Sequence, residues 1–314
     1  MIKKGTKYDV VGLGVSTVDL LMLVDEFPDQ EMVQRAHDST LAGGGPVATA
    51  MVALARLGAR TAMADKLGDD WRGRLIVEEF QREGVATDLL AIAEASSSIA
   101  SILVRKRDGA RTIVYAPGDV GEMLPAEISH DALAASILHL NGRHLESCLF
   151  LAERAKKDGV LVSFDGGAHR YRSELDELLK LTDICIVARE FAASFSGQPE
   201  EVAASAASLM DAGSQIVVIT GGTDGCWVFR KGEAAFHQPA FLMPSVVDTT
   251  GAGDAFHGGF LFGMLRGWTL PDCAVVASAV AALSTQKLGG RAGLPSLSEV
   301  RAFLFSRGPY SLPL

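Results

Sequence analysis

The segment DTTGAGDAFHGGF, which begins at Asp248, places two glycines and an acid directly before an apolar stretch. The apolar residues that follow recur at helical spacing, which predicts a helix that begins near Ala252. The first backbone N–H groups of a helix have no partner within it, and Gly251 and Gly253 carry no side chain that would keep an anion away. Residues 251–253 therefore predict a cradle for a phosphate group.

Asp254 lies in the first turn of this predicted helix. Because the positive end of a helix favours an ionised carboxylate, we expect Asp254 to be charged near neutral pH and able to take a proton from a hydroxyl group. Phosphoryl transfer uses fixed N–H dipoles and a metal ion to stabilise the charge that spreads over the transferred group. The segment thus indicates phosphoryl transfer to a hydroxyl, although the same residues could also only turn the chain and cap a helix.

Strand-like and helical segments alternate along the rest of the chain. These elements form the scaffold that holds the predicted phosphate cradle in place. Strands are predicted at residues 8–14, 59–68, 135–141, 160–165, 183–187 and 215–220, and helices at 46–58, 149–159, 173–181 and 200–213. This alternation predicts an α/β fold with a mostly parallel sheet covered by helices on both faces, whose ligand sites lie beyond the carboxyl ends of the strands.

Two segments, residues 19–41 and 98–116, break this alternation and read as extended chain. Asp108 and Gly109 form a good hairpin turn within the second segment. We therefore expect one domain over residues 1–314 with a small β-sheet lid, whose exposed edge could pair with a second copy of the chain to form a homodimer.

Bulk composition excludes several functions. The net charge of −9 gives no general reason to bind nucleic acid or an acidic membrane, and the longest apolar run, residues 274–283, is far shorter than the roughly 20 residues that span a bilayer. The four cysteines are scattered, no export signal is recognised, and a reducing, cytoplasmic location is the simplest interpretation. The seven histidines show no HxxxH spacing, so we expect His257 to pack or to contact solvent and predict no zinc site.

The motifs resemble those of one family. DTTGAGDAF, at residues 248–256, resembles the C-terminal signature of the ribokinase-like, or PfkB, carbohydrate kinases, and AGGGPVATAMVALARLG, at residues 42–58, resembles their N-terminal glycine signature. The resemblance covers nearly the whole chain, and it implies a three-layer α/β/α domain with a β-sheet lid and ATP-dependent phosphorylation of a sugar or nucleoside hydroxyl. It assigns catalysis to Asp254 as the base and to Gly251, Ala252 and Gly253 as the anion hole.

Candidate substrate-binding residues follow the first strand, the glycine signature and the strand at 135–141. They are Asp19, Gly43, Gly44, Gly45, Thr49 and Arg143. The Asp19 carboxylate could accept hydrogen bonds from two neighbouring sugar hydroxyls, while Thr49 stands where most relatives carry Asn. The Arg143 guanidinium could grip a phosphate, sulfonate or carboxylate, with an ordinary surface arginine as the even alternative, and Asp165 ends a strand beside the expected phosphate region.

The resemblance also implies nucleotide and metal sites. The expected ATP-binding residues are Thr220, Gly222, Gly225, Ser278 and Gly289. Asp248 and Thr250 would supply oxygen ligands if K⁺ binds. The family's Asn-x-x-Glu motif falls on Ala188 and Phe191 here, so Mg²⁺ is expected either to reach Glu190 through water or to be held by ATP and water alone.

The substrate is the open part of the interpretation. The chain looks most similar to the sulfofructose-kinase-like and ketohexokinase-like branches, yet Val33 and Tyr115 stand where a lysine and an asparagine for a sulfonate are expected. A neutral sugar, or a phosphorylated sugar held by Arg143 and Arg35, stays open. The alternatives are a nucleoside kinase, a catalytically silent sugar sensor suggested by the missing Asn-x-x-Glu, and a nicotinamide dehydrogenase, which the missing third glycine after Gly12-x-Gly14 disfavours.

Overall fold

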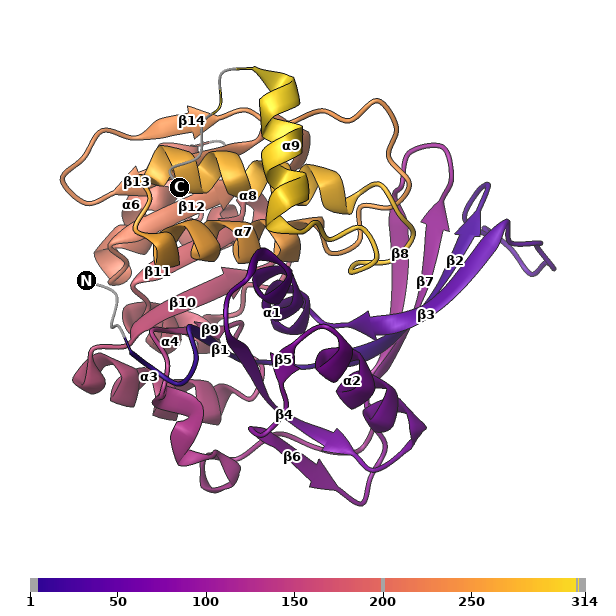
Figure 1. Ribbon diagram of the computed structural model, residues 1–314, viewed down its shortest axis with the longest axis horizontal. Helices are drawn as coiled ribbons and strands as arrows, with labels where there is room; N and C mark the ends of the chain where they lie inside the picture. The colour runs from indigo at the N-terminus through magenta and orange to yellow at the C-terminus, as the bar shows by residue number, and fades with distance from the viewer. Residues whose placement is uncertain (1–4, 199–200, 309, 311–314) are drawn as a thin grey trace.

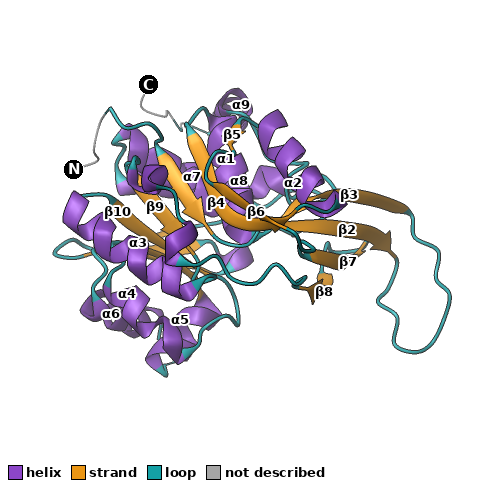
Figure 2. Cartoon of the chain, turned by 90° about the horizontal axis from the view of Figure 1, so that it is seen from below, coloured by secondary structure: helices purple, strands orange, loops and turns teal. Residues whose placement is uncertain are grey.

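A central sheet covered by helices on both faces forms the body of the molecule in the computed structural model, which describes residues 5–198, 201–308 and 310 (Figure 1, Figure 2). The sheet has ten strands within these residues, in the order β14-β13-β12-β11-β10-β9-β1-β4-β5, with β6 paired to β4. The strands are β1 (Val10–Leu13), β4 (Thr61–Gly68), β5 (Val85–Ala86), β6 (Leu90–Ala93), β9 (Ile137–Leu140), β10 (Leu161–Gly166), β11 (Ile184–Ala188), β12 (Ile216–Thr220), β13 (Cys226–Arg230) and β14 (Phe236–Gln238).

Alternation of side chains along the strands gives the sheet two apolar faces. Val10 packs into one buried cluster and Val11 into the other, and every pairing from β12 to β5 is parallel, so both faces need helices. One face carries α1 (Pro46–Leu57), α2 (Trp71–Arg82), α7 (Ala252–Arg266), α8 (Leu270–Ser284) and α9 (Leu297–Arg307). The other carries α3 (Leu145–Asp158), α4 (Asp176–Lys180), α5 (Arg189–Ser196) and α6 (Val202–Ala212). The predicted α/β fold with a mostly parallel sheet is confirmed.

A second sheet of four strands projects from this body (Figure 1). Its order is β3-β2-β7-β8, with bounds β2 (Thr17–Val24), β3 (Asp38–Gly44), β7 (Ile99–Arg105) and β8 (Arg111–Ala116). Its own small core consists of Leu21, Ala100, Ile102 and Val104, whereas β8 is exposed along its whole length. The segment predicted as extended over residues 19–41 is two strands separated by a loop at 25–37, because acids, Pro28 and Gln30 leave that stretch without alternating apolar residues.

Two helix predictions differ from the structure. The helix predicted at 149–159 begins at Leu145, because Cys148 and Ala152 continue its buried stripe toward the N-terminus. The helix predicted at 173–181 is a 3-10 turn, Ser173–Leu175, followed by the short α4. Three further 3-10 turns span Pro125–Glu127, His130–Leu133 and Gly222–Asp224. No helix in the described ranges combines the length and apolar character that a membrane crossing requires.

Candidate active site

A cleft of about 1030 Å³ lies between the small sheet and the carboxyl ends of the central strands. Asp19, Ala100 and Tyr115 face it from β2, β7 and β8, because directly paired residues of neighbouring strands share one face. Nine of the predicted site residues line it, namely Asp19, Gly45, Thr49, Arg143, Thr220, Thr250, Gly251, Gly253 and Asp254. The cleft thus lies where the sequence analysis expects ligand sites, beyond the carboxyl ends of the parallel strands.

The start of α7 forms one wall of the cleft. Gly251 is the N-cap residue and has φ +74, and a Cβ added to it would lie 2.9 Å from Cα and O of Gly290. This left-handed backbone and close approach both require glycine. The Ala252 N–H donates to the Thr249 carbonyl at 3.3 Å, whereas no acceptor exists within the described residues for the N–H groups of Gly251, Gly253 or Asp254. Unpaired N–H donors therefore belong to residues that line the cleft, whereas Ala252 is outside the lining and its N–H is already bonded.

Asp254 follows these donors and is half-buried at the cleft surface. Burial, followed by the negative charge of Asp165, raises the pKa of its carboxyl group to about 7, although Arg170 and Arg111 oppose the rise. The helix end alone predicts a carboxylate that is charged near neutral pH, whereas a pKa of about 7 leaves the group only partly ionised there. Loss of solvent disfavours the charged form of the carboxylate, and the group titrates near neutrality.

Asp19 faces the same cleft from β2 and is 8% exposed. Its Oδ1 accepts a hydrogen bond of 2.6 Å from the Thr17 hydroxyl, and burial raises the pKa of its carboxyl group. A Cβ on Gly44 would lie 2.1 Å from Asp19 Oδ2, so the glycine makes room for this side chain. The charge of Asp19 also raises the pKa of Asp254, which places the two carboxylates within electrostatic reach of each other.

Glycine is required at the other two positions of the signature, Gly45 and Gly43, for different structural reasons. Gly45, with φ +93, lines the cleft at the start of α1. Gly43 instead leaves space for a buried ion pair, since its N–H donates to Glu79 and a Cβ there would lie 2.3 Å from Arg291 Nη1. Gly43 and Gly44 are thus outside the cleft lining, and only Gly45 offers backbone to a ligand there.

Thr49 lies on α1 at the cleft, 2% exposed, and its Oγ1 accepts a hydrogen bond of 3.3 Å from Arg291 Nε. Arg291 also donates to the Gly44 carbonyl at 2.6 Å and pairs with Glu79 at 3.3 Å. The hydroxyl is therefore already engaged by the protein, which leaves it a lone pair and its proton for a ligand.

Four arginines line the cleft beside three aspartates. Arg143 lies over the Tyr115 ring of β8 at 5.5 Å and so links the body to the small sheet. Sequence reasoning missed three more cleft arginines, Arg111, Arg170 and Arg172. No ion pair involving any of the four occurs among the described residues. The signal for Arg170 was present, because GGAHRYR follows the carboxyl end of β10.

Few of the residues predicted for the nucleotide reach the lining. Thr220, at the end of β12, does, but Gly222, Gly225, Ser278 and Gly289 do not. Gly225 has φ +90, and a Cβ there would lie 2.1 Å from the Gln238 carbonyl, so the turn itself requires glycine. Ser278 is buried in α8 beside the Cys226 thiol.

The residues predicted to hold K⁺ lie beside the anion cradle. Asp248 accepts hydrogen bonds of 2.8 Å from the N–H groups of both Thr250 and Gly289, and so joins the two loops that meet at Gly251. The Thr250 hydroxyl is buried without a partner within the described part of the chain. Glu190 is exposed on α5 and is outside the described cleft lining, while Phe191 is fully buried.

Comparison with known proteins gives consistent matches over most of the chain. Residues 7–297 match the family described as "pfkB family carbohydrate kinase". An uncharacterized sugar kinase of Archaeoglobus fulgidus is 36% identical over 77% of this chain and 98% of its own, and an ATP-dependent ribose-1-phosphate kinase of Halopiger xanaduensis is 29% identical over 95% and 98%. The structure of Arabidopsis thaliana ribokinase complexed with ribose and ATP superposes with a TM-score of 0.82 at 26% identity, covering 95% of this chain and 98% of that one.

Proposed function

The chain belongs to the pfkB family of carbohydrate kinases, and we propose that it transfers the γ-phosphoryl group of ATP to a hydroxyl group of a sugar or sugar derivative. At the coarser level it is a sugar or nucleoside kinase of the ribokinase type. The observation that carries the finer proposal is the convergence of Asp254, the free N–H groups at Gly251 and Gly253, and Asp19 on one cleft.

Each of these groups has a separate task in the proposed reaction. The Asp19 carboxylate accepts hydrogen bonds from substrate hydroxyls and fixes their orientation. Asp254 takes the proton of the attacking hydroxyl, for which a pKa of about 7 is well matched. The N–H groups at the start of α7 stabilise the charge on the transferred phosphoryl group. The small sheet, proposed here as a lid, excludes water when it closes and so suppresses ATP hydrolysis.

A coupled ADP-release screen tests the proposal across hexoses, pentoses, sugar phosphates, sulfosugars and nucleosides. We expect turnover with a sugar or sugar derivative, and a loss of about 10²- to 10⁴-fold in Asp254→Asn. Asp272→Asn is the matched control, because Asp272 also lies in the first turn of a helix but outside the cleft. Near-normal activity of a folded Asp254→Asn protein would remove the base. Turnover with nucleosides alone would make the chain a nucleoside kinase, and no turnover at all would favour a sensor.

An anionic substrate is the form that the cleft favours. Arg143 and Arg172 both line the cleft beside Gly142, whose carbonyl accepts a hydrogen bond of 2.9 Å from Arg172, and neither forms an ion pair with a described residue, so either could bind an anionic group of the substrate. Arg35, the second arginine considered for a phosphorylated sugar, is exposed in the 25–37 loop outside the described lining. A ribose-1-phosphate kinase among the relatives is in keeping with this preference.

Replacing Arg143 tests that preference. Arg143→Gln is expected to raise KM at least about tenfold for a phosphorylated or sulfonated sugar and to leave KM for a neutral sugar unchanged, because a charge-assisted pair is lost only with the anion. Arg154→Gln is the control, since Arg154 also lies over an aromatic ring, that of Phe150, on the exposed side of α3. Equal KM changes for both kinds of sugar would contradict an anion-binding role.

Metal ions enter the proposal in two ways. We propose that Mg²⁺ arrives with ATP and is held by phosphate oxygens and water, where it neutralises phosphate charge, because Glu190 is not at the cleft. For K⁺ the residues fit, since the buried Thr250 hydroxyl lacks a partner beside Asp248 in the described structure. Activity in K⁺ against an equal ionic strength of tetramethylammonium would test the second part.

The assembly and location of the enzyme are also part of the proposal. We propose a homodimer formed through the lid, whose edge strand β8 exposes Ile113, Val114 and Tyr115. All four cysteines are free and buried, which supports action in the reducing cytoplasm.

A further inference from the structure

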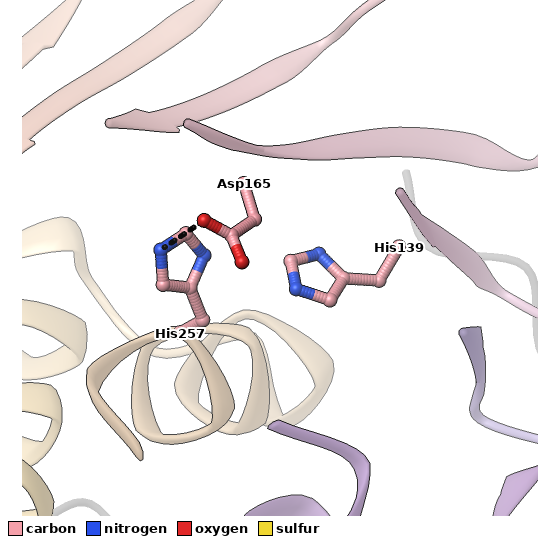
Figure 3. A group of neighbouring side chains, drawn as sticks. All are labelled: His139, Asp165 and His257. Atoms are coloured by element: carbon pink, nitrogen blue, oxygen red, sulfur yellow. Dashed lines mark ion pairs between the residues drawn. The ribbon is translucent and has the colours of Figure 1, made fainter. Parts of the chain in front are cut away.

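Two histidines and an aspartate from three separate elements meet at the floor of the cleft (Figure 3). His139 comes from β9, Asp165 from the neighbouring parallel strand β10, and His257 from α7, one turn after Asp254. All three side chains are almost completely buried, with exposed fractions of 0%, 3% and 5%. One potential ligand atom from each lies within 4.8 Å of the other two.

Each of the three residues carries a buried polar atom without a hydrogen-bond partner in the described structure. These atoms are Nε2 of His139, Oδ2 of Asp165 and Nδ1 of His257. The second carboxylate oxygen, Oδ1, lies 3.6 Å from His257 Nε2, and Figure 3 shows the carboxylate lying between the two imidazole rings. Leaving a buried polar atom unpaired is unfavourable, so three such atoms in one cluster indicate a missing partner.

The chemistry of the three groups suits a metal ion. A neutral imidazole has one ring nitrogen with a free lone pair, and the unpaired Nε2 of His139 and Nδ1 of His257 are the atoms that could supply it. Ser163 Oγ lies 3.1 Å from His139 Nδ1, an outer contact that leaves Nε2 to a ligand when Nδ1 carries the proton. Two imidazole nitrogens and one carboxylate oxygen are a donor set typical of Zn²⁺ and other first-row divalent ions, whereas Mg²⁺ prefers oxygen ligands.

We propose that His139, Asp165 and His257 form a binding site for one first-row divalent transition-metal ion, such as Zn²⁺. Tetrahedral coordination with bonds of about 2.0–2.1 Å separates ligand atoms by about 3.3 Å, so the side chains must close inward slightly around the ion. Asp165 and His257 line the cleft whereas His139 lies beneath them, which leaves the fourth position open toward the cleft. The site is distinct from MgATP and from the oxygen ligands proposed for K⁺.

Sequence spacing could not indicate this site, because its three residues are distributed over positions 139, 165 and 257. A single buried water molecule, or a proton shared between Asp165 and an imidazole, would satisfy the same atoms without a metal. Direct binding measurements separate these cases, and they need neither nucleotide nor sugar. Their outcome is therefore independent of the kinase proposal.

The test uses the full chain, freed of metals on a chelating resin and titrated with Zn²⁺ against a chromophoric chelator. We expect one tightly bound Zn²⁺ per chain, and visible absorption typical of four-coordinate Co²⁺ when Co²⁺ replaces it. Asp165→Asn and His257→Asn should each lower Zn²⁺ affinity at least about 100-fold, and Ser163→Ala about 10-fold through the lost outer contact. His130→Gln, an exposed histidine outside the cluster, should change nothing.

Circular dichroism and thermal melts with and without Zn²⁺ accompany each variant. Should a ligand variant fail to fold, the Ser163→Ala affinity and the Co²⁺ spectrum of the unmodified chain still decide the matter. Absence of Zn²⁺ binding by the unmodified chain, or binding that His130→Gln weakens as much as the cluster variants do, would overturn the proposal.

Discussion

At the scale of single residues, the environment of Asp254 sets the chemistry more than its position on a helix does. The first turn of α7 favours the carboxylate, yet burial and the neighbouring Asp165 raise its pKa to about 7. A base that titrates near neutrality is half-ionised at neutral pH and holds the accepted proton well enough to make transfer favourable. The positive charges of Arg111 and Arg170 lower the pKa of Asp254, in addition to any contact that they make with substrate.

The pH profile of the reaction follows from this pKa. Because only the deprotonated form of Asp254 accepts a proton, kcat/KM should rise tenfold per pH unit below about 7 and level off above it. Arg170→Gln removes a charge that lowers this pKa, so its midpoint should lie at higher pH. Comparing the two profiles with the same MgATP cancels the ionisation of ATP. An unshifted midpoint in Arg170→Gln, with Arg154→Gln as control, would contradict this account.

At the scale of elements, short connections rather than whole helices fix the site. The Gly251 turn, the Asp248 carboxylate and the loop around Gly290 meet where α7 begins. The buried Glu79–Arg291 pair joins α2, the end of β3 and the same loop region, with Arg291 reaching Thr49 on α1. The Gly251 turn holds the start of α7 at the cleft, and the Glu79–Arg291 pair does the same for α1.

The Gly251 turn gives a prediction about activity. Gly251→Ala should lower kcat by about 10²-fold or more, because the added Cβ must displace Gly290 and move the N–H donors. Gly58→Ala is the matched control, since Gly58 also has positive φ, +101, at the end of α1 but would place its Cβ in open space. Gly58→Ala should lose about 1–2 kcal/mol of stability from the left-handed backbone, and Gly251→Ala should lose more because of the added contact with Gly290. Equal activity in the two variants would show that the turn does not position the donors.

The Glu79–Arg291 pair gives a prediction about stability. Arg291→Met should lower the free energy of unfolding by about 3–5 kcal/mol in urea titrations, because it leaves the Glu79 carboxylate buried and uncompensated. The double variant Arg291→Met/Glu79→Met should recover part of that loss. Arg230→Met, which breaks an exposed pair with Glu233, should cost less than about 1 kcal/mol. A similar small loss in Arg291→Met would mean that the buried pair contributes little.

At the scale of the whole molecule, the small sheet has two faces with different tasks. Ile113 and Tyr115 of β8 face the cleft, whereas Val114 between them points to the opposite side and is 69% exposed. Closure over substrate would use the first face, and the proposed dimer would use the second face and the free edge of β8.

Opposite-face variants separate these tasks. Val114→Lys should convert a dimer into a monomer in size-exclusion chromatography with light scattering, because a buried charge and a longer side chain oppose association. Val33→Lys, on the exposed 25–37 loop, should leave the mass unchanged. An unmodified chain that is monomeric at micromolar concentration, or a Val114→Lys protein that stays dimeric, would contradict association through the lid.

The sequence by itself determined the layers of the fold, the start of α7 and much of the cleft. These features depend on local periodicity, on glycine where φ is positive, and on the rule that ligands lie beyond the carboxyl ends of parallel strands. For the same reason it identified Asp254 and Gly251 correctly as neighbours of the cavity.

Only the tertiary structure decided what depends on contacts between distant segments. Burial by several elements raises the pKa of Asp254, an effect that its place at the helix end could not indicate. Arg291 reaches Gly44 across 247 positions, and His139, Asp165 and His257 meet from β9, β10 and α7. Spacing along the chain carries no information about such meetings, because packing of the sheet against its helices creates them.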